Sequence, residues 1–217
     1  MKKEPKPYHH GDLRHALLEA VLAHVEEFGG AGQLTLRETA RRANVSHSAP
    51  YRHFPDRQAI LASVAAEGFA KLSGALREAR AGVADNEERF IRTGLAYLRF
   101  ARDRRGYLAV MFGPEVAKNH TPELQQSAND AFTVLQEMAA DARAVDGAQA
   151  RRLGTVIWSF VHGLATLTAQ SQVPSSVNET PDGLATLGLR CLFWSFESRR
   201  SRTPIATKKP RTSQPAR

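Results

Sequence analysis

Residues 34–61 of the chain read LTLRETARRANVSHSAPYRHFPDRQAIL, and local signals in this stretch decide the fold. Thr35 is followed three residues later by Glu38, a capping-box pair in which each side chain satisfies a free backbone N–H at the start of a helix. The apolar and charged residues that follow are typical of a short amphipathic helix. We therefore predict a helix over Leu36–Ala43.

A tight turn and a second short helix are expected directly after the first. Asn44-Val45-Ser46 has the composition of a turn, and the Ser46 hydroxyl is a good N-cap for a helix over His47–His53. Phe54-Pro55 closes that helix, and Pro50 falls close enough to its start to be tolerated. Two short helices joined by a three-residue turn make a helix-turn-helix, a unit that places its second helix in the major groove of DNA.

Helical periodicity extends from this unit in both directions, and no run alternates convincingly with a period of two. In the preceding helix we expect a buried stripe made of Leu13, Leu17, Ala20, Val21, Val25 and Phe28. The predicted fold class is all-α, with an N-terminal three-helix module linked by a long helix to a larger helical domain. Besides the two short helices, we expect helices over Asp12–Phe28, Asp56–Ala81, Asn86–Asp103, Gly106–Phe112, Pro122–Val145, Ala148–Gln170 and Pro181–Ser198.

The net charge of +8 is concentrated in a C-terminal tail. Residues 198–217 carry seven Lys or Arg and no acid, whereas residues 1–197 carry 23 basic and 22 acidic residues. The pI near 10.1 therefore does not by itself indicate nucleic-acid binding. We expect four segments, namely a flexible basic tail over 1–10, the helix-turn-helix module over 11–57, a larger helical domain over 58–200 and a disordered basic tail over 201–217.

Composition and absent motifs exclude several classes of protein. The single Cys191 excludes a disulfide framework and CxxC metal motifs, and we expect it to be a small buried hydrophobe in a reducing cytoplasm. The first residues lack the apolar segment of a secretory signal, and we interpret the uncharged stretch over Leu153–Asn178 as a buried helix instead of a membrane span. No phosphate-binding loop, nucleophile elbow or zinc motif occurs. We expect a cytoplasmic protein that is not an enzyme, with no catalytic site, metal site, cofactor or membrane contact.

Positive charge gathers within the helix-turn-helix. Over Gly32–Arg57 five arginines face two acids, a local balance of +3 to which His47 and His53 can add. Contact with DNA phosphates requires such a local excess. A second interpretation stays open, because two short helices with a tight turn also occur in other helical proteins, and arginines also solvate a surface.

The same residues closely resemble the DNA-binding module of the TetR family of bacterial repressors. The similarity rests on the hydrophobic-Thr-hydrophobic-Arg start at residues 34–37, on Ala40, on Val45-Ser46 and above all on YRHFP at residues 51–55. These elements occur in the order of the family and follow an amphipathic first helix that ends at Phe28-Gly29.

Two further stretches resemble one branch of that family. They are YHHGDLRHALLEA at residues 8–20 and IWSFVHGLATL at residues 157–167, the second being similar to the Trp-x-x-x-His-Gly motif of the branch's C-terminal domain. The resemblance covers residues 8 to about 198. The sequence departs from the family at Pro50, where many members have Leu or another helix former.

The resemblance implies a set of DNA contacts. In the family the helix after the turn reads base edges, which assigns base contacts to residues 47–49 and a phosphate contact to Tyr51. Thr35 and Arg57 match other backbone contacts, whereas phosphate contact and a solvated surface both stay open for Arg37. The candidate DNA-binding set is Thr35, Arg37, Ser46, His47, Ser48, Ala49, Tyr51, Arg52, His53 and Arg57.

A homodimer on a double-stranded operator with an inverted repeat is also implied by the resemblance. In the family the last two helices, here Ala148–Gln170 and Pro181–Ser198, form a four-helix dimer interface, and their apolar residues exceed a single stripe. A purely internal core is the alternative. Gly163 is expected to permit the close approach of another helix.

The family resemblance finally implies a pocket for a small-molecule effector of unknown identity in the C-terminal domain. Its candidate lining residues, each of which could also be ordinary core, are Tyr97, Tyr107, Met111, Phe112, Trp158 and His162. The function expected is that of a sequence-specific transcriptional repressor released from its operator by the effector. The alternative is a protein that binds DNA without sequence specificity, or a scaffold, with no effector response.

Overall fold

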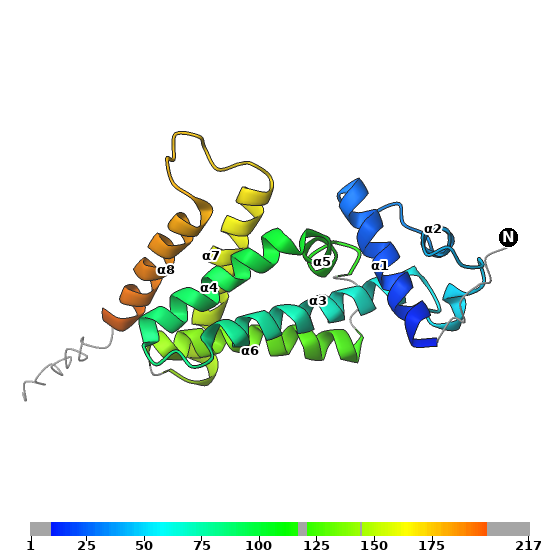
Figure 1. Cartoon of the computed structure of the whole chain (residues 1–217). Helices are drawn as coiled ribbons and strands as arrows, with labels where there is room; N and C mark the ends of the chain where they lie inside the picture. The colour runs from blue at the N-terminus through cyan, green and yellow to red at the C-terminus, as the bar shows by residue number, and fades with distance from the viewer. Residues whose placement is uncertain (1–9, 117–120, 144, 199–217) are drawn as a thin grey trace, which may run out of the picture.

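The computed structural model describes residues 10–116, 121–143 and 145–198, and within these ranges the chain is helical without any strand (Figure 1). The all-α prediction is confirmed. Apart from His10, the expected tails over 1–10 and 201–217 lie outside the described residues. The elements are α1 (His10–Phe28), α2 (Leu36–Arg42), the 3-10 helix η1 (Pro50–Arg52), α3 (Arg57–Arg80), α4 (Asn86–Asp103), α5 (Arg105–Met111), α6 (Pro122–Ala142), α7 (Gly147–Ala169) and α8 (Pro181–Ser198).

The helices form two groups that α3 joins (Figure 1). At one end, α1, α2 and η1 build a small module, from which α3 runs lengthwise along α6. α4 packs on α3, α6, α7 and α8, and the short α5 contacts both α1 and α3. One continuous core of buried side chains extends from Leu17 and Phe54 in the module to Phe90 and Phe193 at the other end.

α3, the helix that joins the two groups, has a capped N-terminus and many buried positions. Its N-cap is Asp56, whose Oδ1 accepts a hydrogen bond from the Ala59 N–H at 2.8 Å. By length and composition α3 could cross a membrane, but 56% of the apolar window is buried inside the protein, as in the core helix of a soluble fold. Its buried positions are Ile60, Leu61, Ala62, Val64, Ala65, Ala66, Gly68, Leu72, Ser73 and Leu76.

Helix bounds follow the predicted caps and periodicity closely. α4 and α8 begin and end at the predicted residues, and the other long helices agree with their predicted bounds within three residues. Thr35 caps α2 by accepting a hydrogen bond from the Glu38 N–H at 3.1 Å, as the first half of the capping box requires.

One predicted helix is wrong. We expected an α-helix over His47–His53, whereas the structure has turns followed by a single turn of 3-10 helix over Pro50–Arg52. Hydrogen bonds there reach carbonyls three residues earlier, for example from the Ala49 N–H to the Ser46 carbonyl at 3.0 Å. Pro50 explains the change, because it has no N–H to donate to the carbonyl of Ser46 four residues before it.

Two residues expected to be buried lie at the surface, and a third lacks the helix contact expected of it. Phe28, assigned to the buried stripe of the first helix, is 62% exposed because it is the last residue of α1 and extends past the core. Cys191 is exposed, since the inward positions of α8 are taken by Leu189 and Phe193. Gly163 faces open space, and a Cβ added there meets no atom within 4 Å among the described residues. Within the part of one chain that the structure describes, the expected helix contact at Gly163 is therefore absent.

A network of ion pairs fixes the far end of α3 to α4 and α6. Arg80 of α3 donates to both Glu137 and Asp141 of α6, and its distance to Asp141 Oδ2 is 2.7 Å. Arg89 of α4 donates to the other carboxylate oxygen of Asp141, also at 2.7 Å. Asp141 is 8% exposed in its side chain and Arg80 14%, so both charges are largely removed from water. Each charge needs the opposite charge beside it to offset its lost hydration.

Asp141→Asn is expected to lower the free energy of unfolding by about 3 kcal/mol, because it leaves two partly buried guanidinium groups without their shared carboxylate. Urea denaturation followed by circular dichroism measures this loss. The matched control is Asp103→Asn, whose carboxylate pairs with Arg102 at the surface and is 58% exposed, so that a change of about 0–1 kcal/mol is expected. Equal losses in the two variants would contradict a structural role for the buried network.

Candidate nucleic-acid interface

The turn between α2 and η1 is built by two backbone hydrogen bonds that end α2. The Val45 N–H donates to the Ala40 carbonyl at 3.0 Å, and the Asn44 N–H donates to the Arg41 carbonyl at 3.1 Å. This pair of bonds is a Schellman motif, which requires a left-handed residue, and Asn44 supplies it with φ of 54°. Val45 packs on the core beneath the turn. The turn therefore holds the following residues in a fixed direction relative to α2.

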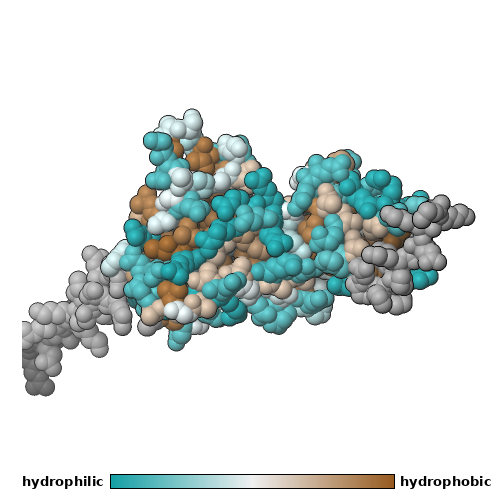
Figure 2. All heavy atoms as spheres, viewed as in Figure 1, coloured by the Kyte–Doolittle hydropathy of each residue, from teal (hydrophilic) through white to brown (hydrophobic). Residues whose placement is uncertain are grey.

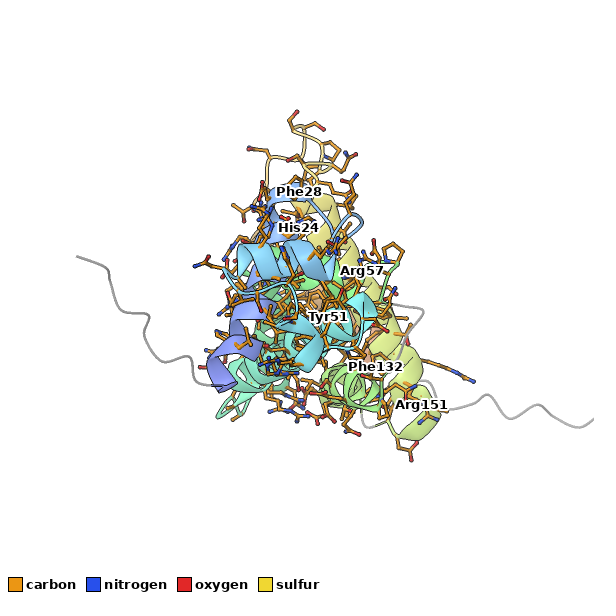
Figure 3. The ribbon with its side chains drawn as sticks, turned by 90° about the vertical axis from the view of Figure 1, so that its right-hand side faces the viewer. His24, Phe28, Tyr51, Arg57, Phe132 and Arg151 are labelled. Atoms are coloured by element: carbon orange, nitrogen blue, oxygen red, sulfur yellow. The ribbon has the colours of Figure 1, made fainter. Side chains whose placement is uncertain are left out.

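Most of the predicted DNA-binding residues lie at the surface of the module. Figure 3 views the module end-on, with Tyr51 near the centre of the face it presents. Tyr51 is 56% exposed, and His53 is half-buried. Ala49 is buried at 9% exposure, so the structure does not bring it to this surface. The exposed members of the set are Thr35, Arg37, Ser46, His47, Ser48, Tyr51 and Arg52.

Two of the five module arginines are paired with acids inside the module. Glu38 accepts hydrogen bonds from Arg41, at 2.7 and 2.8 Å, and from Arg42 at 2.8 Å. The Arg41 hydrogen bond is the main reason that the pKa of Glu38 falls to about 2. Arg42 also reaches Glu27 of α1 at 2.8 Å, which ties α2 to α1. These two guanidinium groups therefore contribute less free charge to the surface than the sequence count suggests.

Arg57 is engaged within the protein. Its Nη2 donates to the carbonyls of Ala31 and Gly32, in the loop between α1 and α2, and lies 4.0 Å from Glu115. This differs from a backbone-contact arginine that extends freely towards DNA. Arg57 instead fixes the first residue of α3 to the loop that precedes α2.

Free positive charge on the module comes from other arginines. The side chains of Arg37 and Arg52 are exposed and make no ion pair with another described residue. Arg14 of α1, which the sequence analysis did not select, lies with its guanidinium carbon 5.7 Å from the centroid of the Phe54 ring. Arg14 and Phe54 are 40 residues apart in the sequence, so their contact could not be predicted before the fold was known.

A buried histidine lies behind the α1–α2 contact. His24 is 5% exposed, and neither ring nitrogen has a hydrogen-bond partner among the described residues. Its ring centroid is 4.6 Å from that of Phe28, and the Arg42 guanidinium lies 5.5 Å from the Phe28 ring (Figure 3 labels His24 and Phe28). Burial, with a smaller contribution from the positive charge of Arg42, lowers the pKa of His24.

Four of the six predicted pocket residues meet in the larger domain. The Tyr97 hydroxyl lies 2.9 Å from His162 Nδ1, and Phe112 lies 4.5 Å from His162 and 5.8 Å from Trp158 between ring centroids. Burial lowers the pKa of His162 and raises that of Tyr97, so both groups are neutral at pH 7.

The other two predicted pocket residues pack elsewhere. The Tyr107 hydroxyl donates to Glu67 of α3 at 2.8 Å, and Met111 lies against Gly68, where an added Cβ would come within 2.6 Å of its sulfur. Both side chains are at most 5% exposed. They hold α5 against α3 and are core residues.

The chain is similar to known proteins in its sequence and in its fold. Residues 90–192 match a family model described as Tetracyclin repressor-like, C-terminal domain. The chain is similar to a solved structure of a protein of unknown function from Rhodococcus sp. RHA1, with 32% identity and a TM-score of 0.75 over 88% of this chain and 98% of that one. No curated protein sequence matches the chain.

Two more distant structures share the fold. A bacterial regulatory protein in the tetR family from Rhodococcus RHA1 is 18% identical, with a TM-score of 0.66 over 84% of this chain and 95% of that one. The fatty acid degradation regulator FadR from Bacillus halodurans is 15% identical, with a TM-score of 0.66 over 89% of this chain and 97% of that one. At these identities the likeness concerns the architecture alone.

The stability of the chain is expected to fall as the pH drops below about 6.5, the ordinary pKa of histidine. Because burial lowers the pKa of His24, the unfolded chain binds a proton before the folded chain does, so the free energy of unfolding decreases from that pH down through the lowered folded value. Urea denaturation at pH 7.5 and pH 5 measures the effect.

His24→Leu removes the group and should reduce this pH dependence. The carboxylates of Glu27 and Glu38 and the guanidinium groups of Arg42 and Arg57 act on His24 and stay in place in the variant. His15→Leu is the control, because it removes a histidine whose side chain is 63% exposed, and the comparison of the two variants isolates the buried imidazole. If His24→Leu kept the full slope, the buried imidazole would not be its source.

Proposed function

The chain belongs to the TetR family of transcription regulators, and from this premise we propose that it represses transcription as a homodimer bound to a symmetric DNA operator. A small molecule that binds the larger domain releases the dimer. The observation that carries the proposal is the exposed set on the helix-turn-helix, made of Arg37, His47, Ser48, Tyr51 and Arg52, together with the turn at Asn44 that two backbone hydrogen bonds hold. In this proposal the protein binds its operator in the cytoplasm.

The exposed set divides into two roles by chemistry. Arg52 and Arg37 carry guanidinium groups that pair with no acid among the described residues, and the Tyr51 hydroxyl is exposed, so we assign them to phosphate oxygens. His47 and Ser48 stand at the start of the short segment after the turn and carry groups that donate and accept hydrogen bonds, so we assign them to base edges. Ala49 and Arg57 act within the protein in this proposal, one by packing and the other by holding α3.

An exposed apolar surface on α7 and α8 supports the proposed dimer. We define the α7–α8 surface as Val156, Leu167, Leu187, Cys191 and Trp194, all of them exposed, with Trp194 at 55% and Leu187 at 63%. Figure 2 shows hydrophobic side chains open to solvent at this end of the molecule. Apolar residues gathered in this way mark surfaces that are covered in an assembly. Gly163, which faces open space, would let a partner helix approach α7 closely.

A few contacts would connect a bound effector in the larger domain to the DNA-binding module. α5 contacts both α1 of the DNA-binding module and α3, and Phe112 directly after α5 contacts His162 of α7 with its ring tilted by 55°. A cavity of about 610 Å³ lies at the same place, between Glu26 of α1, Arg105 of α5 and His162. An effector that favours one position of Phe112 would also favour one position of the module, which is what differential binding requires.

Arg52→Ala is expected to weaken binding to every duplex and to reduce the slope of log K against log salt by about two for the bound dimer, because one phosphate contact per protomer is lost. His47→Ala should instead change the preferred base pair at one position of each half-site, at a loss of about 1–3 kcal/mol per half-site. Fluorescence anisotropy with the selected operator and with a random duplex, from 50 to 300 mM salt (about a sixfold range), measures both.

The control is Arg151→Ala, an exposed arginine at the start of α7, labelled in Figure 3 with Tyr51. It removes the same charge from a different part of the chain and should leave the salt slope unchanged. If the wild-type chain bound random and selected duplexes equally, it would be a non-specific DNA-binding or scaffold protein, and the proposed function would be wrong.

Leu187→Glu and Trp194→Glu are each expected to convert the dimer to monomer at micromolar concentration, because each buries a carboxylate in an apolar interface. Sedimentation velocity measures the change. Val177→Glu is the matched control, since Val177 is an exposed apolar residue, 38% accessible, in the loop between α7 and α8. A dimer that persists in both surface variants would place the interface elsewhere.

A further inference from the structure

Aromatic rings from different helices surround one cleft in the larger domain. The cleft has a volume of about 230 Å³ and is lined by Phe69 of α3, Tyr97 of α4, Phe112 after α5, Phe132 of α6 and Trp158 of α7. Phe132 is labelled in Figure 3, on α6 below the DNA-binding module in that view. Smaller apolar side chains of α3 and α6 complete the walls.

The rings are arranged around a space and are not packed fully into the core. Phe69, Phe112, Phe132 and Trp158 are each only partly buried, although all four pack against the hydrophobic core. Phe69 meets Phe112 edge to face at 5.5 Å and an interplanar angle of 80°, and Phe112 meets Trp158 at 5.8 Å. Ring faces that are left uncovered in this way can make stacking and edge contacts with a planar ligand.

Among the described residues, no Asp, Glu, Lys or Arg lines this cleft. The Tyr97 hydroxyl already bonds to His162, and Asn129 carries the one side-chain amide in the lining. A buried charge without a partner loses its hydration and gains nothing in return. The cleft therefore discriminates against ionised ligands and can satisfy one or two polar atoms.

The neighbouring cavity differs in carrying charged side chains. Its lining includes the charged Glu26 and Arg105 and the polar Thr166 and Gln170 among apolar residues, and Phe112 lines both spaces. A charged molecule would find partners there but not in the aromatic cleft. Because only one of the two linings carries charged side chains, ligand charge decides between the sites.

We propose that the effector is a small uncharged aromatic compound of one or two rings, which stacks against Phe112 and Trp158 in the aromatic cleft. This inference rests on the proposed function for its regulatory meaning, while binding itself does not depend on DNA. The size follows from the volume, since an apolar cavity of about 150 Å³ holds one benzene ring, and this cleft measures about 230 Å³. Asn129, at the surface of α6, would bond a single hydroxyl or carbonyl.

Tryptophan fluorescence of the full-length chain tests the proposal with 2-naphthol and 2-naphthoate, which have the same ring system and differ in charge at pH 7.5. The Trp194→Phe background leaves Trp158 as the single tryptophan, since the chain has two. We expect 2-naphthol to quench the fluorescence of Trp158 in a saturable manner. The apparent Kd for 2-naphthoate should be higher by about tenfold or more. Equal affinity for the two compounds, or no saturable quenching by 2-naphthol, would overturn the proposal.

Filling the cleft provides a second measurement. Ala128→Phe adds a ring from α6 into the lining and should weaken 2-naphthol binding by about tenfold. Gln125→Phe adds the same ring at an exposed position of α6 outside the lining and should leave binding unchanged. Equal binding in the two variants would place the naphthol site elsewhere and contradict the proposal.

Operator binding by the same protein separates this inference from the proposed function. If the chain binds its operator but does not bind 2-naphthol, the proposed ligand class is wrong and the proposed regulatory function is retained. If it binds 2-naphthol at Trp158 but shows no sequence preference among duplexes, the cleft is real and the regulatory function is wrong.

Discussion

The hydrogen bonds from the Arg57 guanidinium to the carbonyls of Ala31 and Gly32 fix how the DNA-binding module sits on the rest of the chain. Arg57 is the first residue of α3, and Arg80, the last, is held by Glu137 and Asp141 of α6. The same helix therefore belongs to both parts of the protein and is anchored at each end by an arginine. A shift of α3 within the larger domain would move the loop before α2 with it, and this gives the proposed function a second route from the effector to the DNA-binding module, besides the contact of α5 with α1.

The ion pairs inside the module decide which of its charges can meet DNA. Glu38 pairs with Arg41 and Arg42 within α2, and the pair of Arg42 with Glu27 holds α2 against α1. Arg37 and Arg52 stay exposed and make no ion pair with another described residue. Non-specific attraction to phosphate is thus limited, and contacts with bases gain relative weight in the proposed complex. The basic residues after Ser198 lie outside the described residues.

Local signals in the sequence predict local structure well, and long-range contacts less well. The capping pair at Thr35 and the periodicity of α4 and α8 predict those elements closely, because they depend on neighbours three and four residues away. The 3-10 turn at Pro50 follows from a missing N–H, which is a local cause that the sequence itself contains. The engagement of Arg57 and the burial of Ala49 depend on residues brought close only by folding, and the aromatic cleft needs rings from separate helices. No periodicity encodes such contacts.

The central claim is that this chain reads a symmetric DNA sequence as a dimer, and selection from a random duplex pool tests it most directly. The full-length chain is incubated with the pool at about 150 mM salt, a physiological ionic strength, and the bound fragments are sequenced through successive rounds. The account predicts enrichment of one inverted repeat whose half-sites are spaced by about one helical turn of about 34–36 Å or by a multiple of it. A bound pool with the same sequence composition as the input would contradict it.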